Sequence, residues 1–460
     1  MATLAELTPE ILDIVLSYLG PQDITRFGRT SQGANAFIRP SNQLLWRSAF
    51  LHIFDDPKVA WELLQPVARA ANRARESVWD WHYELKRRCT ARNAVCDGDT
   101  TALTDPTGVV TTFLDIFETA SYRTDPILMR RSSLNVDFLN NIFEVAPRPE
   151  RIVHDYHRDI DSASLPLHFM ADSSRPLTRA NLWRRTLVPD WASKFHIFYG
   201  ATKREGDSVR AKAAARALVY DWSVTGPASD YGPLKQDQSG TVNWQVLEAI
   251  TSLMNRIFDT IGLTIPMGFK SHIPYYVSRQ TFRNKDDWAG ITGSWVGTYA
   301  FLDYRALVHY NFANHLEYSM DLGADQEACG DVMRLKLELS NDEDLRNDRK
   351  LITRMPSCTD LPTLYFSGSS SGRPIGRPSI LVRGCASLVP GGKQVRWRFI
   401  ISYAGADQWQ LEGIQPGGIC SGAVYGLWSH VEHEEHGPVG PFCYYFDSAA
   451  SIRGHCLDPE

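Results

Sequence analysis

The sequence lacks closely spaced cysteine pairs. Its eight cysteines are scattered between Cys89 and Cys456, and no two of them are separated by only two residues. Structural zinc sites and small disulfide scaffolds depend on such pairs, so neither is expected here. We expect buried thiols and no metal or other cofactor, in an intracellular protein of the cytoplasm, the nucleus or both.

Long apolar runs and an excess of basic charge are also missing. No stretch reaches eighteen consecutive apolar residues, and Glu6, Glu10 and Asp13 interrupt the N-terminal segment, so neither a transmembrane helix nor a signal peptide is expected. The 48 Lys and Arg residues are outnumbered by 53 Asp and Glu residues, for a net charge of -5. Binding to phosphate backbones needs a concentrated basic surface. We therefore expect neither a membrane partner nor a nucleic-acid partner.

Motifs of known catalytic sites are missing as well. There is no G-x-S-x-G nucleophile elbow, and the Gly-rich stretch SGSSSG at 367–372 is not followed by the Gly-Lys-Ser/Thr of a phosphate-binding loop. No paired carboxylates and no nucleophile–base pair stand out. The sequence therefore nominates no catalytic residue, and we expect a non-catalytic protein.

One histidine cluster has two interpretations. His430, His433 and His436 lie three apart in SHVEHEEHGPVG, among three glutamates, and such side chains can bind zinc. The stretch lies between two strand-like segments and ends in Gly-Pro, so a solvated polar loop is the favoured interpretation. The same preference applies to His154 and His157 in RIVHDYHRD.

The chain is too long for one hydrophobic core, because its 460 residues exceed the size at which cores divide into domains. Residues 7–54 have helical patterns throughout, and within them 11–19 are apolar on nearly every side of the expected helix. Helical signals continue, with irregular stretches, as far as about residue 275. Thereafter the hydrophobic period changes from that of a helix to that of a strand.

Alternating residues predict strands in the C-terminal part. QVRWRFIISYAG places Trp397 and Phe399 on one face and Arg396 on the other, where we expect it to be exposed. Gly-rich and Pro-rich stretches such as 367–378 are expected to be turns, and the charged run 341–350 a solvated loop. Roughly eight to ten short strands over about 170 residues are typical of a β-sandwich or β-barrel.

The N-terminal segment resembles an F-box in the order and spacing of its residues. The family pattern is a Leu and Pro before a greasy helix, a second helix starting with Pro, and a closing Leu-Trp, here Leu45-Trp46. The resemblance implies a three-helix unit that binds the Skp-type adaptor of a cullin–RING ubiquitin ligase. The implied adaptor-binding residues are Leu7, Pro9, Ile11, Leu12, Ile14, Val15, Leu19, Ile24, Phe27 and Trp46.

The C-terminal part is similar to the lipocalin-like barrel that serves as substrate domain in F-box-only proteins that target D-type cyclins. The resemblance rests on 286–299, 403–415, 421–430 and 440–446, including the Gly293-x-Trp295 element whose Trp plugs a lipocalin barrel. Some relatives hold a structural zinc, for which no ligand set is found here. The candidate barrel and substrate residues are Trp295, Tyr299, Trp397, Trp409, Trp428 and Tyr444, which either line a binding pocket or fill the barrel interior.

The resulting prediction is an α+β multidomain protein. It has an F-box over 1–54, a mostly helical spacer over 55–275, an antiparallel lipocalin-like β-barrel over 276–450 and a tail over 451–460. The predicted function is substrate recognition in an SCF-type (cullin–RING) E3 ubiquitin ligase, with an unknown protein substrate. Two alternatives stay open: a barrel for a small apolar ligand tethered to an F-box, and a barrel enzyme with an N-terminal tether.

Overall fold

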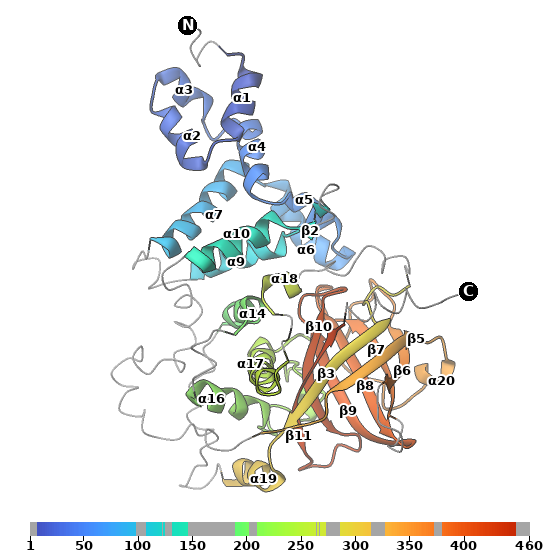
Figure 1. Ribbon diagram of the computed structural model, residues 1–460. Helices are drawn as coiled ribbons and strands as arrows, with labels where there is room; N and C mark the ends of the chain where they lie inside the picture. Colours follow the sequence, from blue (N-terminus) through green and yellow to red (C-terminus); the bar gives the residue numbers. More distant parts are fainter. Residues whose placement is uncertain are drawn as a thin grey trace, which may run out of the picture. The chain divides into compact units, whose positions relative to one another are not determined.

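A computed structural model describes residues 7–97, 107–121, 123–124, 131–145, 189–201, 209–263, 265, 267–272, 286–313, 327–371 and 380–447 (Figure 1). The contacts within the chain divide it into two compact units, Met1–Val153 and His154–Glu460, and each is considered by itself below. In the described ranges, every helix is too short or too polar to cross a lipid bilayer.

The first unit begins with four short helices, whereas the F-box resemblance implied three. They are α1 (Pro9–Ser17), α2 (Pro21–Gly28), α3 (Gln32–Phe37) and α4 (Gln43–Ile53). Separate caps explain the division. The Ser31 hydroxyl accepts a hydrogen bond from the Ala34 amide (3.1 Å), and Asn42 Oδ1 accepts one from the Leu45 amide (3.4 Å). Each cap satisfies an orphan amide and so starts a new helix.

Further helices make up most of the described remainder of the first unit. These are α5 (Pro57–Glu62), α6 (Pro66–Ser77), α7 (Trp81–Cys96), α9 (Thr107–Glu118) and α10 (Leu134–Val145). The two-residue strands β1 (Arg123–Thr124) and β2 (Arg131–Ser132) pair antiparallel. The fully buried Arg88 guanidinium lies 4.8 Å from the ring centroids of both Phe50 and Phe54. It therefore joins α4 to α7 through cation–π contacts in the core.

Helices in the second unit flank one side of the barrel. They are α14 (Asp190–Tyr199), α16 (Val209–Val219), the 3-10 helix η4 (Pro227–Ser229), α17 (Trp244–Thr260) and α18 (Phe269–His272). Leu247, Ile250 and Met254 follow one another at helical spacing along one face of α17, and all three are fully buried. The helix packs on the barrel wall, where the rings of Phe258 and Tyr445 lie 5.9 Å apart.

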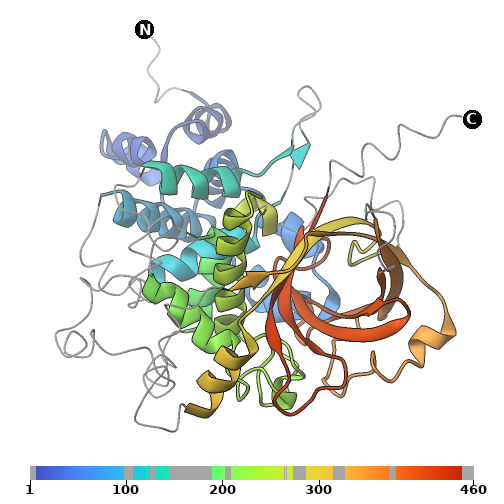
Figure 2. The same cartoon turned by 60° about the horizontal axis from the view of Figure 1, so that its bottom comes forward.

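Eight antiparallel strands close into a barrel (Figures 1 and 2). They are β3 (Gly293–Phe301), β5 (Met333–Leu339), β6 (Leu364–Ser371), β7 (Ile380–Leu388), β8 (Val395–Tyr403), β9 (Ala406–Gln415), β10 (Ala423–His430) and β11 (Val439–Phe446). Each pairs with the next, and β11 returns to β3, where Phe446 faces Trp295 in register. The two-residue β4 (Ala328–Cys329) pairs antiparallel with the last residues of β3, and α19 (Tyr304–Ala313) and α20 (Glu343–Arg346) lie in connections. The predicted barrel is thus present.

Two local predictions in the barrel are wrong. Ser367 to Ser371 belong to β6 rather than to a turn, because Gly368 lets the strand approach β5 closely: a Cβ there would lie 2.2 Å from the Lys336 carbonyl oxygen. Arg396 does lie opposite Trp397, as expected, but it is buried rather than exposed. Its guanidinium is covered by residues from outside the barrel, which the strand pattern does not reveal.

Candidate functional site

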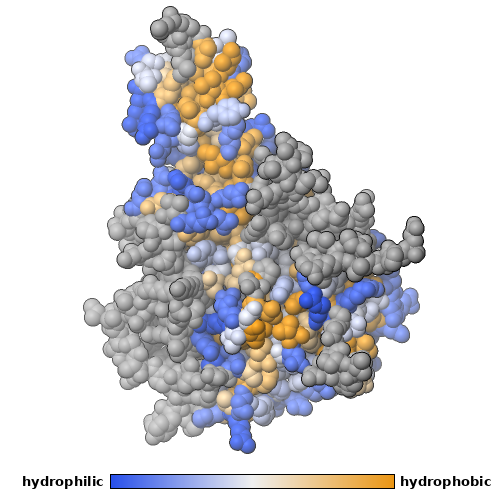
Figure 3. All heavy atoms as spheres, viewed as in Figure 1, coloured by the Kyte–Doolittle hydropathy of each residue, from blue (hydrophilic) through white to orange (hydrophobic). Residues whose placement is uncertain are grey.

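Helix α1 has two apolar faces, and only one of them is used inside the first unit. Leu12 and Leu16 are buried and pack toward α4. Four other apolar side chains, at the spacing i, i+3, i+4 and i+7, remain exposed to solvent. They are Ile11, Ile14, Val15 and Tyr18, which we call the N-terminal apolar stripe. Figure 3 shows hydrophobic atoms gathered over this part of the first unit.

The stripe is more than scattered surface hydrophobicity. Ile14 exposes 60% of its surface and Tyr18 74%, and Leu44 at the start of α4 exposes 71%. Single exposed apolar residues are normal, but several in one helical row are typical of a surface that binds another molecule. The row is held in place because the opposite face of α1 is anchored. The Asn42 amide contacts Asp13 Oδ1 (3.5 Å) and the Phe37 carbonyl oxygen (3.0 Å).

The ten predicted adaptor-binding residues fall into three groups in this structure, by how exposed each side chain is. Leu12, Ile24 and Trp46 are buried and form the core of the helical segment. Leu7 and Phe27 are half-buried, and the remaining five, Pro9, Ile11, Ile14, Val15 and Leu19, are exposed. Sequence reasoning did not separate these groups. Counting the apolar positions of α1 in steps of three and four would have distinguished the two faces and included Tyr18.

The six predicted barrel residues lie together in the barrel interior. Trp295 and Trp397 have ring centroids 5.0 Å apart, and Trp409 and Trp428 4.9 Å apart. The ring of Tyr299 lies 5.5 Å from that of Trp428, and Tyr444 is buried in the same core. Rings at these separations pack against one another in the manner of a protein core.

The buried indoles of the barrel also have hydrogen-bond acceptors. The N–H of Trp295 donates to the Ile291 carbonyl (2.8 Å), and that of Trp428 to the Ala300 carbonyl (2.9 Å). The indole of Trp397 donates to the Gln415 side chain (3.0 Å). Such bonds fix each ring, because an unpaired buried N–H is costly. Of the six predicted residues, only Tyr299 and Trp409 keep part of their surface accessible.

Charged residues on the outer face of the barrel form a buried cluster with Asp230, which we call the Arg396 network. Arg396 contacts Glu412 (2.8 Å) and Asp230 (2.6 Å), and Arg398 contacts Asp230 (2.8 Å) and also pairs with Glu412. Burial alone would raise the pKa of Asp230, yet the two guanidinium groups hold it below its ordinary value. The network joins the segment after η4 to strands β8 and β9.

The histidines of the β10–β11 connection do not converge. The ring of His433 stacks on Tyr231 at 3.7 Å, and the ring of His436 lies 4.9 Å from Trp222. Within the described ranges, no three His, Cys, Asp or Glu side chains are grouped so as to hold a metal ion. His154 and His157 lie outside the described residues.

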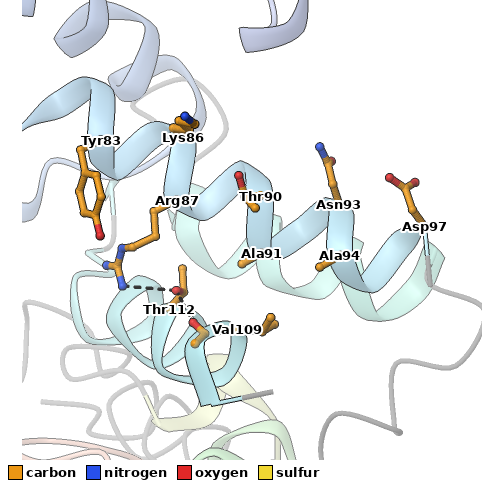
Figure 4. Close-up of a pocket in the computed structure, with 11 residues that line it drawn as sticks. Tyr83, Lys86, Arg87, Thr90, Ala91, Asn93, Ala94, Asp97, Val109 and Thr112 are labelled. Atoms are coloured by element: carbon orange, nitrogen blue, oxygen red, sulfur yellow. Dashed lines mark hydrogen bonds between the residues drawn. The ribbon is translucent and has the colours of Figure 1, made fainter. Parts of the chain in front are cut away.

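A groove of about 730 Å³ lies between α7 and α9 in the first unit (Figure 4). Arg87 reaches across it to the Thr112 hydroxyl (3.3 Å), and its guanidinium also pairs with Glu84 (2.8 Å) and Asp115 (2.7 Å). The described lining residues include neither His nor Cys. One of its two described lining cations, Arg87, is thus already paired with carboxylates, and the other is Lys86.

The comparisons with known proteins add no family assignment. No protein-family model, curated protein or solved structure matches the chain.

Proposed function

We propose that this chain is a non-catalytic, substrate-recognition subunit of an SCF-type (cullin–RING) E3 ubiquitin ligase. The observation that carries the proposal is the N-terminal apolar stripe, an exposed row on a helix whose opposite face is already buried. Its chain position coincides with the segment that resembles an F-box. The proposed partner of the stripe is a Skp-type adaptor, and the proposed partner of the barrel is a protein substrate.

The proposed mechanism is proximity. One unit holds the ligase and the other holds a substrate, so the lysines of the substrate reach a high effective concentration near the ubiquitin-conjugating enzyme. Such a subunit needs two binding surfaces and no catalytic group of its own. The first unit presents an exposed apolar row, and the second has an aromatic barrel with half-buried Tyr299 and Trp409.

Co-purification with a Skp-type adaptor tests the first half of the proposal. Replacing Ile14 and Val15 together by Asp places two charges in the stripe. Losing an aliphatic anchor costs about 2–4 kcal/mol, or roughly two to three decades of affinity. The double variant should therefore fail to co-purify. Because both side chains are exposed, the variant should still fold, as its far-UV circular dichroism would show.

The matched control places the same charges on exposed polar positions of α2 and α3. Gln22→Asp combined with Gln32→Asp should co-purify as the unmodified chain does. Stoichiometric adaptor in the Ile14/Val15 double variant would contradict adaptor docking through the stripe. Loss of adaptor in the Gln22/Gln32 variant as well would point to a general effect of added charge.

The barrel is equally compatible with a small apolar ligand. Native mass spectrometry of the full chain distinguishes the two functions: a ligand retained at a defined mass supports the small-ligand barrel. A pull-down from cells in which cullin neddylation is blocked tests the substrate half, because proteins awaiting ubiquitination should accumulate on the chain.

A further inference from the structure

A cavity of about 300 Å³ lies in the second unit, beside the end of the barrel at which β10 finishes and β11 begins. One wall comes from residues 222–231, between α16 and α17, and the other from 429–439, which connect the two strands. The two segments are tied together, because the Trp222 indole N–H donates to the Gly437 carbonyl (3.1 Å). The volume is at the lower end of the range for ligand pockets and is enough for one large side chain.

Aromatic rings form much of the wall. Tyr231 stacks on His433 with the ring planes 7° apart, and both line the cavity. Trp222 lines it too, and its ring lies 5.9 Å from that of Phe312 on α19. The faces of such rings carry a negative quadrupole that attracts cations.

The charged side chains of the described lining are all carboxylates. Glu434 and Glu435 line the cavity, and its described lining includes neither Lys nor Arg. Among the described residues neither glutamate makes an ion pair, whereas Glu432 on the same connection pairs with Lys350 (3.3 Å). Burial, helped by the nearby Arg398 charge, lowers the pKa of His433 to about 4, so its imidazole is neutral at pH 7. The cavity therefore presents negative potential without an internal counter-charge.

The part of the cavity wall that carries Tyr231 is held in place by residues outside the cavity. Asp230 and Tyr231 both have a left-handed backbone, with φ of 53° and 60°, which side-chain-bearing residues adopt only when the surroundings enforce it. The enforcement comes from the Arg396 network and from the Thr353 hydroxyl, which donates to Asp230 (2.5 Å). Tyr231 is thus preorganised, so a ligand would not have to order this wall on binding.

We infer that this cavity binds the cationic side chain, Lys or Arg, of a polypeptide. Two exposed aromatic residues beside it supply a surface for the flanking residues of such a peptide. Tyr304 and Phe312 are each 52% exposed, the Tyr304 hydroxyl donates to the His436 carbonyl (3.1 Å), and Phe312 contacts the His436 ring. Aromatic anchors of this kind dominate peptide interfaces. The cavity lies entirely in the second unit, so binding of a cationic side chain there does not depend on whether the first unit binds an adaptor.

The test measures binding of short blocked peptides to the full chain by ligand-observed NMR titration. The probes are acetyl-Gly-Lys-Gly-amide, its Arg counterpart and the neutral norleucine counterpart, which keeps the aliphatic stem but has no charge. Cation–π contacts and two carboxylates should favour the Lys and Arg probes over norleucine by about tenfold. Equal affinity of all three peptides would overturn the inference.

Variants of the lining residues test whether the cationic side chain binds in this cavity. Glu434→Gln combined with Glu435→Gln should abolish the preference for the charged probes, whereas Glu432→Gln on the same connection should preserve it. Tyr231→Phe should bind as the unmodified chain does, and Tyr231→Leu should lose the ring contribution, weakening binding severalfold. A preference that survives in the double Gln variant would place the cation elsewhere and refute the site.

Spermidine distinguishes a peptide site from a site for free polyamines. The aromatic surface of Tyr304 and Phe312 should favour a peptide, so acetyl-Trp-Lys-Trp-amide should bind several times more tightly than acetyl-Gly-Lys-Gly-amide. This gain should shrink in Phe312→Ser, because Phe312 is exposed and contributes to that surface. Spermidine that binds more tightly than every peptide, together with no gain from the tryptophans, would overturn the polypeptide assignment.

Discussion

At the scale of single residues, position on a strand does not decide burial. Arg396 and Lys336 both point away from the barrel interior, as strand alternation predicts. Lys336 is 70% exposed and pairs with Glu338, which is 66% exposed, whereas Arg396 is almost fully buried between Glu412 and Asp230. The difference arises because residues near 230 and 353 cover β8, whereas Lys336 on β5 stays exposed among the residues that the structure describes.

The first prediction concerns this pair of cations. Arg396→Ala should lower the free energy of unfolding of the second unit by about 3–5 kcal/mol, because it leaves Glu412 buried without one of its partners. Lys336→Ala should change it by less than about 0.5 kcal/mol. Chemical denaturation followed by tryptophan fluorescence gives both values. Similar shifts for the two variants would contradict the buried network.

At the scale of elements, one carboxylate joins three segments of the first unit. Asp55 follows α4 and is completely buried. It accepts hydrogen bonds from the Ser133 hydroxyl (2.5 Å), from the Leu134 amide at the start of α10 (3.1 Å) and from the Ser121 amide (2.9 Å). A negative charge at a helix N-terminus also interacts favourably with the helix dipole. Asp55 therefore acts as the cap of a helix that begins far away in the sequence.

The second prediction follows from this cap. Asp55→Ala should destabilise the first unit by about 3 kcal/mol or more, because several buried donors lose their acceptor at once. Its neighbour Asp56 is a partly exposed cap: it accepts from the Lys58 amide at the start of α5 (3.0 Å) and lies 3.9 Å from the Arg47 guanidinium, so Asp56→Ala should cost about 1 kcal/mol. Thermal unfolding followed by circular dichroism compares them. An equal or smaller effect at Asp55 would show that its hydrogen bonds do not matter for folding.

The third prediction concerns acid stability at the β7–β9 wall of the barrel. Hydrogen bonds from Arg383, Ser402 and Lys350 hold the pKa of Asp407 well below its model-peptide value of 3.8. Below pH 4 an unfolded chain takes up a proton at this position while the folded chain does not. The stabilisation is therefore complete above that range and is lost as the pH falls toward the lower, folded-state pKa.

Melting temperatures measured from pH 5 to pH 2 test that dependence. The melting temperature of the second unit should decrease as the pH is lowered. In Asp407→Asn it should decrease less steeply, because the amide side chain cannot take up the proton. Asp344→Asn, at an exposed position of α20 in the same unit, is the control. If Asp407→Asn and the unmodified chain lose stability with the same slope, the Arg383–Asp407 contact does not stabilise the folded state.

At the scale of the whole molecule, the two compact units correspond to the two proposed binding roles. The exposed stripe lies in Met1–Val153, and both the barrel and the cation cavity lie in His154–Glu460. Helix α17, predicted as part of a spacer, packs directly on β10 and β11. A cut near residue 275 would therefore expose barrel surface that α17 covers, and a cut between 153 and 154 would not.

The fourth prediction uses that division. Fragment 1–153 should bind the adaptor and no substrate protein, and fragment 154–460 should retain substrate proteins and the Lys and Arg probes. Each fragment must first show cooperative thermal unfolding. Parallel interaction screens then compare them with the full chain. Substrate proteins that bind fragment 1–153 rather than fragment 154–460 would contradict substrate recognition by the barrel.

The sequence by itself determined the local features: the helical start, the alternation of β8, the aromatic residues of the barrel interior and the surplus of apolar residues on α1. These follow from side-chain periodicity, which acts over a few residues. Only the tertiary structure decided which face of α1 is exposed, that Arg396 is buried, and that Tyr231 meets His433. Each of these depends on segments distant in the chain, and contacts between such segments are set by packing and charge pairing that no local pattern records.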